Sequence, residues 1–167
     1  MCIFLTRGCP CGYYTDPTRE CRCSSHQIHR YISKISGPLL DRIDIHVEVP
    51  RVRYRDLKQA ESGATSADIR GQVEAGRAVQ AERFDGTGTG VNARMTARQI
   101  KRHCGLTPGA ERLLASAMES EQLSARAHNR VLKVARTIAD LSDSADIKTE
   151  HIAEAIQYRT LDRDLWA

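Results

Sequence analysis

The stretch that decides the fold lies near the end of the chain and reads SARAHNRVLKVARTIAD, residues 124–140. Its apolar residues recur every three or four positions, which is the spacing of one face of an α-helix. Ser124 is a favourable N-cap residue, so we expect a helix that begins directly after it. The face predicted to be buried consists of Ala127, Val131, Val134, Ala135 and Ile138. A basic stripe of Arg126, Arg130 and Lys133 is predicted on the opposite side.

Helical spacing continues on both sides of this segment. Upstream, Ile69, Val73 and Phe84 predict one face of a long helix from about Ser66, and the glycines of residues 86–90 predict a flexible loop after it. A short helix is expected over 96–103. Another is expected to be capped by Thr107, to begin with Pro108 and to bury Ala110, Leu113, Leu114 and Ala117. The last is expected to be capped by Thr149 and to bury Ile152, Ala153 and Ile156.

The first third of the chain follows a different pattern. Ser24 or Ser25 can cap a short helix that ends at Gly37-Pro38. Apolar and polar residues then alternate over 43–49, which predicts a β-strand with His46 on its polar side, either facing solvent or hydrogen-bonded. One strand cannot satisfy its own backbone hydrogen-bonding groups, so it needs partners that this chain barely supplies. We therefore expect a piece of a larger core.

These patterns predict a mainly α fold class, in which the C-terminal remnant of an α/β core with one strand is followed by a helical bundle. Residues 1–60 are expected to hold the end of the core, with a cysteine-rich insertion. Residues 61–95 are expected to form a linker and the long helix. Residues 96–167 are expected to form the bundle.

The composition narrows the class of protein. The chain has 167 residues, of which 25 are Lys or Arg and 21 are Asp or Glu, giving a formal net charge of +4. Residues 1–60 contain ten basic and six acidic residues, so the whole excess lies there. This charge is too small to establish nucleic-acid binding. No segment approaches the roughly 20 apolar residues that a membrane helix needs, and we expect a cytoplasmic protein without a membrane partner.

Four cysteines form the clearest chemical feature of the sequence. Cys9, Cys11, Cys21 and Cys23 make two Cys-x-Cys pairs on either side of turn-forming residues. Clustered thiols in a reducing compartment are more often metal ligands than disulfides, and four thiolates suit tetrahedral Zn²⁺. His26 or His29 could replace one ligand. Such a site would be structural, because four protein ligands leave no position for water. The alternative is a set of free thiols in a surface insertion.

Two arginines are placed where an external anion would suit them. Arg42 lies between a predicted helix and the predicted strand, and its planar guanidinium could reach an anion. The alternative is an internal ion pair with Asp41 or Asp44. Arg126 lies in the first turn of its helix, where the positive end of the helix dipole favours an anionic neighbour. Its alternative is an ordinary solvated helix face.

One further pair, His103 and Cys104, is a weak candidate for a base and a nucleophile. Adjacent helical residues point in different directions, and no orienting acid is evident. Burial of Cys104 is the expected outcome.

Several longer segments of the sequence resemble a known family. These are CPCGYY (9–14), ISGPLLDRIDIHVEVP (35–50), LSARA (123–127), VARTIADL (134–141) and HIAEAIQYR (151–159). In this order they resemble the C-terminal part of the magnesium chelatase-like AAA+ ATPases of the YifB and competence protein ComM type.

The resemblance implies the end of an AAA+ core followed by a helical lid, in a protein that forms a ring, expected to be a hexamer. It implies ATP with Mg²⁺ at subunit interfaces and DNA as a partner, in branch migration and recombination during transformation. By the same resemblance, Arg42 takes the position of the arginine finger, which reaches the γ-phosphate held by a neighbouring subunit. Arg126 takes the position of the lid sensor, which contacts phosphate within its own subunit.

The sequence lacks two motifs that such an ATPase needs. It contains no Gly-x-x-x-x-Gly-Lys-Ser/Thr, and no apolar strand that ends in a Mg²⁺-binding acidic pair. We therefore expect a fragment that does not hydrolyse ATP alone. Two other functions stay open: a free-standing zinc-binding module that contacts nucleic acid or a protein, and a magnesium chelatase subunit proper.

Overall fold

The computed structural model describes residues 8–14, 16, 18–40, 42–47, 49, 52, 63–120 and 123–159. The described residues fall into two compact units, one within residues 1–59 and the other within residues 60–159. Each unit is treated by itself below.

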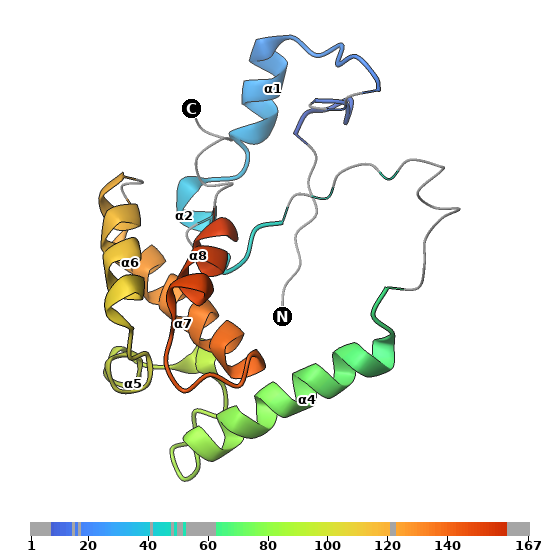
Figure 1. Cartoon of the computed structure of the whole chain (residues 1–167). Helices are drawn as coiled ribbons and strands as arrows, with labels where there is room; N and C mark the ends of the chain where they lie inside the picture. Colours follow the sequence, from blue (N-terminus) through green and yellow to red (C-terminus); the bar gives the residue numbers. More distant parts are fainter. Residues whose placement is uncertain are drawn as a thin grey trace. The chain divides into compact units, whose positions relative to one another are not determined.

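The unit within residues 60–159 is built from helices (Figure 1). Helix α7 contacts α4, α5, α8 and the 3₁₀ helix η1, while α6 packs against α8. The mainly α fold class is therefore confirmed. The elements are α4 (Ser66–Arg83), η1 (Asn92–Arg94), α5 (Ala97–His103), α6 (Pro108–Ser120), α7 (Ala125–Leu141) and α8 (Thr149–Gln157).

Short polar side chains fix where these helices begin. The Ser124 Oγ accepts a hydrogen bond from the Ala127 N–H at 3.1 Å, as expected for the N-cap of α7. Thr96 caps α5 as predicted, in a reciprocal arrangement with Gln99. Helix α8 differs from the prediction, because its N-cap is Lys148. The Lys148 N–H donates to Nδ1 of His151 at 3.1 Å, so the imidazole takes the place of the N3 side chain in a capping box.

The hydrophobic core of this unit forms where α6, α7 and α8 meet. Val131, Ala135 and Ala139 of α7 are fully buried, as are Ala110 of α6 and Ile152 of α8. Ile147 joins them from the segment before α8, where its N–H donates to the Gly105 carbonyl at 3.1 Å. A Cβ on Gly109 would lie 2.7 Å from the Thr149 Oγ1, so a glycine is needed where α6 and α8 approach each other.

Helix α4 is only partly packed. Phe84, at its C-cap, is buried, but Ile69 and Val73 are 51% and 49% exposed. The face predicted for α4 is therefore buried only towards its C-terminal end. Beyond the helix, Gly86, Gly88 and Gly90 all have positive φ, in agreement with the predicted loop.

Among its described residues, the unit within residues 1–59 has two short helices, α1 (Ser25–Ile32) and α2 (Gly37–Leu40). Ser24 caps α1 in a reciprocal arrangement with Gln27. The strand predicted over 43–49 is wrong for the residues that the structure describes there, 43–47 and 49, none of which lies in a strand. Alternation selects a strand only when a neighbouring strand satisfies its backbone groups.

His46 also departs from its predicted position. It is buried, whereas Ile45, Val47 and Val49 of the same segment are 48%, 62% and 82% exposed. Asp44 is exposed and Ile43 is half-buried, as the alternation predicts, so the departure is confined to His46 and the exposed apolar residues around it. Without a strand, alternation no longer decides which side chains are buried.

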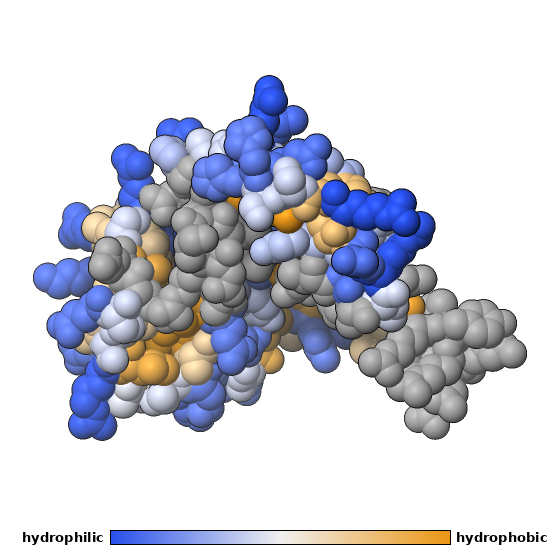
Figure 2. All heavy atoms as spheres, turned by 90° about the horizontal axis from the view of Figure 1, so that it is seen from above, coloured by the Kyte–Doolittle hydropathy of each residue, from blue (hydrophilic) through white to orange (hydrophobic). Residues whose placement is uncertain are grey.

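Most of the coloured surface in Figure 2 is hydrophilic, with smaller hydrophobic areas between the charged side chains. Among the described helices, none is long and apolar enough to cross a bilayer.

Candidate functional site

Four cysteine sulfurs converge in the unit within residues 1–59. The Sγ atoms of Cys9, Cys11, Cys21 and Cys23 all lie within 4.8 Å of one another. Cys9 and Cys11 are 3.3 Å apart, Cys11 and Cys21 3.6 Å, and Cys9 and Cys21 3.7 Å, measured between sulfurs. Tetrahedral zinc with bonds of about 2.3 Å places its sulfurs about 3.8 Å apart. The cluster therefore has the donors and the spacing that such an ion requires.

Backbone N–H groups point at these sulfurs. The Gly12 and Tyr14 N–H groups donate to the Cys9 Sγ at 3.2 and 3.3 Å. A hydrogen bond from the Tyr13 N–H lowers the pKa of Cys11 to about 6. Gly12 makes this turn possible with a φ of 82°. Such donors stabilise thiolate, which is the form that binds metal. His26 and His29 are exposed and are not part of the cluster that the structure describes.

Arg42 lies two residues after the last residue of α2, and its side chain is exposed. The Arg42 N–H donates to the Leu39 carbonyl at 3.0 Å, so a backbone turn at the end of the helix holds its Cα in place. Asp41, one of its two candidate acidic partners, lies outside the described residues.

Arg126 is exposed in the first turn of α7, two residues after the N-cap. This first turn contains no acidic residue. The guanidinium therefore lies at the positive end of a 17-residue helix without a carboxylate in that turn. Arg42 and Arg126 belong to different units of the structure.

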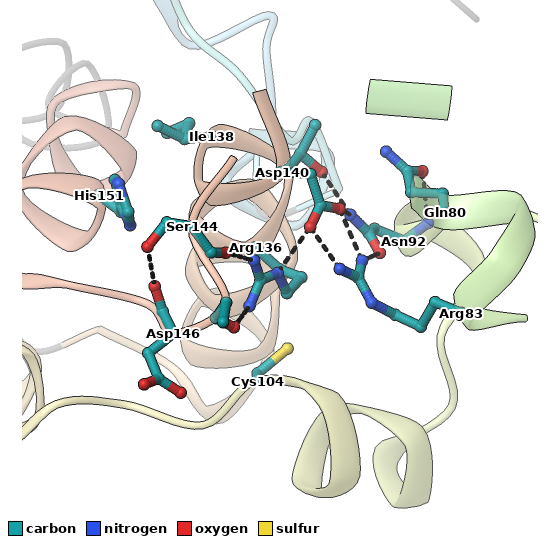
Figure 3. Close-up of polar contacts among 12 residues, drawn as sticks. Gln80, Arg83, Asn92, Cys104, Arg136, Ile138, Asp140, Ser144, Asp146 and His151 are labelled. Carbon is teal, nitrogen blue, oxygen red and sulfur yellow. Dashed lines mark hydrogen bonds and ion pairs between the residues drawn. The ribbon is translucent and has the colours of Figure 1, made fainter. Parts of the chain in front are cut away.

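A buried charged cluster lies further along α7 (Figure 3). Asp140 accepts hydrogen bonds from Arg83 of α4, from Nδ2 of Asn92 in η1 at 2.7 Å, and from Nε of Arg136 at 2.9 Å. Arg136 also donates to the carbonyls of Ser144 and Ala145. Burial by itself would raise the pKa of Asp140, but the hydrogen bonds from Arg83 and Asn92 and the charge of Arg136 hold it below its ordinary value.

Cys104 is buried, as expected. Burial raises the pKa of its thiol to about 11, so it is no nucleophile at neutral pH. The neighbouring His103 ring packs edge-on against Phe84, with ring centroids 5.6 Å apart. The two side chains therefore serve the packing of α5.

Two family models match the chain. The model for magnesium chelatase, subunit ChlI, matches residues 1–57. The model for the C-terminal part of the same subunit matches residues 63–159, which is more than half of the chain. The chain belongs to the magnesium chelatase ChlI family.

Individual family members are similar over nearly the whole chain. The competence protein ComM of Haemophilus influenzae is 39% identical over 155 residues, which cover 92% of this chain. The YifB proteins of Salmonella typhimurium and Escherichia coli are 37% and 36% identical over the same share. The matched part is 29% of the length of each of these three relatives.

The two ChlI matches divide the candidate residues between them. Arg42 and the four cysteines fall in the first matched segment, and Arg126 falls in the second. The buried cluster around Asp140 also lies in the second, and sequence analysis missed it. The available signal was the Arg136–Asp140 spacing of four residues, which places both side chains on one side of a helix.

Proposed function

We propose that this chain supplies the arginine finger and the lid sensor of a ring-forming ATPase of the magnesium chelatase family. The observation that carries the proposal is that Arg42, shortly after α2, and Arg126, in the first turn of α7, are both exposed and lie in the two segments that the family models match. The assembled ring, in our proposal a cytoplasmic hexamer, binds ATP with Mg²⁺. Residues 1–60 supply the end of the core, 61–95 the linker and long helix, and 96–167 the lid.

Arg42 acts on the nucleotide of the neighbouring subunit. Charge spreads over the oxygens of the γ-phosphoryl group in the transition state, and a guanidinium donor stabilises it there. The exposed side chain and the fixed backbone turn suit this role, because the arginine must reach outward from a defined position.

Arg126 contacts phosphate of its own subunit. Its position in the first turn of α7 places both the guanidinium and the helix dipole at the same anion. Binding or release of this anion would couple the lid to the state of the nucleotide.

The ring acts on DNA in branch migration and recombination. The support for this substrate is the similarity to a relative that is named a competence protein, together with the family match. A role as a magnesium chelatase subunit proper is a second assignment compatible with the family match.

Zinc is the metal that we propose for the four cysteines. Cys9, Cys11, Cys21 and Cys23 would hold it, and it would stabilise the turn that contains them. This cluster also supports a second candidate function, a zinc-binding module that contacts nucleic acid or a protein.

The finger is tested in a chimera in which this chain replaces the matching 29% of the Haemophilus influenzae relative. We expect Arg42→Ala to lower the rate of ATP hydrolysis by at least 10³-fold relative to the unsubstituted chimera. A finger acts on the neighbouring subunit. Mixing Arg42→Ala with a chimera whose phosphate loop is disabled should therefore restore part of the activity.

Arg30→Ala, at an exposed position of α1, is the matched control and should leave turnover unchanged. Unchanged hydrolysis in the Arg42→Ala ring would overturn the assignment. A loss that mixing does not restore would show that Arg42 does not act across an interface.

A further inference from the structure

Charge is unevenly distributed along the unit within residues 60–159. Residues 91–110 contain four basic and no acidic residues, and so do residues 123–139. Residues 140–154 contain five acidic residues and one lysine. Basic and acidic residues are therefore concentrated in different stretches of this unit, although its net charge is small.

The structure brings the two basic stretches together. Helix α7, from the second stretch, contacts both η1 and α5, from the first. The Lys133 Nζ donates to the Ala93 carbonyl at 2.9 Å, next to Arg94. Lys101 of α5 and Asn129 of α7 line one hollow of about 390 Å³. Asn129 lies three residues after Arg126 and four before Lys133, so the hollow borders the basic stripe of α7.

We use the term basic face for five cations of these contacting elements, Arg94, Arg98, Lys101, Arg102 and Lys133. All of them except Lys133 are exposed. Within the part of the chain that the structure describes, no ion pair involves any of these five residues. Glu111 of α6 is the one acidic residue among the described residues that line the hollow.

Favourable interactions with helix dipoles explain the positions of only some of these cations. Lys101 and Arg102 lie in the last turn of α5, where cations stabilise a helix. Arg94 lies in the last turn of η1, and Arg98 lies in the first turn of α5, at the end that disfavours cations. Arg98 is therefore placed against the dipole of its helix, and an external anion would relieve this.

We propose that the basic face binds the phosphodiester backbone of a nucleic acid. Arg98, Lys101 and Arg102 are spaced i, i+3 and i+4, so they share one side of α5 and can contact successive phosphates. Such contacts are independent of sequence and release counterions. The choice of nucleic acid as the polyanion rests on the proposed function, whereas the location of the site rests on the charges and contacts above.

The test measures binding of the full chain to fluorescein-labelled single-stranded and duplex DNA by fluorescence anisotropy, at 50 and 200 mM salt. A variant carries Arg98→Glu, Lys101→Glu and Arg102→Glu. The matched control carries Arg70→Glu, Arg77→Glu and Arg112→Glu, which reverse three exposed charges elsewhere in the same unit. We expect at least a tenfold loss of affinity in the first variant. We also expect a drop of about 3 in the slope of log affinity against log salt, with little change in the control.

Equal losses in both variants, or none in either, would overturn the proposal. Circular dichroism melts of each variant separate a loss of binding from a loss of folding. Displacement of the DNA by millimolar Mg-ATP would also overturn it, because the face would then hold a free nucleotide. None of these results depends on ATP hydrolysis, so a failure here is distinct from a failure of the Arg42 experiment.

Discussion

Asp140 receives hydrogen bonds from side chains of three different elements, α4, η1 and α7. Its side chain is fully buried, and that of Arg136 is 2% exposed. A buried ion pair is an uncertain source of stability when compared with apolar packing, but removing one partner leaves an uncompensated charge. Asp140 is thus the position at which one substitution affects the attachment of three elements.

Asp140→Asn is expected to lower the free energy of unfolding of the helical unit by about 3 kcal/mol at pH 7, because Arg83 and Arg136 lose their shared carboxylate. Urea denaturation of the full chain, followed by circular dichroism, measures this change. Asp85→Asn, at an exposed turn position, is the control. A change below about 0.5 kcal/mol would contradict the stabilising role of the cluster.

The effect of this substitution should depend on pH. The pKa of Asp140 is lower in the folded chain than the value of about 3.9 expected when unfolded. Its contribution is therefore complete above about pH 5 and is lost as the pH falls through the folded-state pKa. The difference between the Asp140→Asn variant and the unsubstituted chain should shrink between pH 5 and pH 2. A difference that stays constant would show that the carboxylate charge is not its source.

At the scale of the element, α7 depends on the residue that starts it. Ser124→Ala removes the hydrogen bond from the Ala127 N–H and should cost about 1 kcal/mol, which lowers the Tm by several degrees. Ser116→Ala, at an exposed position inside α6, is the matched control and should be neutral or slightly stabilising. Thermal melts of both variants decide the point, and equal Tm values would rule out a capping contribution from Ser124.

Local signals account for the elements that sequence analysis placed correctly. Thr96 and Ser124 cap helices through bonds within three residues, so the sequence contains all the necessary information. Arg136 and Asp140 could not be placed in the same way, because their burial depends on Arg83, 57 residues from Asp140 along the chain. The strand predicted from the alternation over 43–49 was wrong for a related reason, since the pattern contains no information about the strand with which it would pair.

At the scale of the whole molecule, the proposed metal and the helical core are separate sources of order. The core of the helical unit includes none of Cys9, Cys11, Cys21 or Cys23. Its folding should therefore not require zinc, whereas the turn that contains these cysteines should.

Metal analysis of the purified chain is expected to give one zinc per chain, and Cys11→Ser should reduce this to a small fraction. Cys104→Ser, which changes the buried cysteine of the helical unit, should retain the metal. After chelation, alkylation should modify Cys11 fastest, because its pKa of about 6 leaves it as thiolate at neutral pH. A zinc content that Cys11→Ser does not change would remove the proposed site.

The partial packing of α4 has a mechanical consequence. Eighteen residues of α-helix form a rod about 27 Å long, and the buried residues of this one, Gly76 and Gln80, lie in its second half. At the end of the rod, Arg83 is bonded to Asp140. A displacement of the helix near Thr65 is therefore expected to be transmitted along α4 to its contact with α7 and to the bond between Arg83 and Asp140.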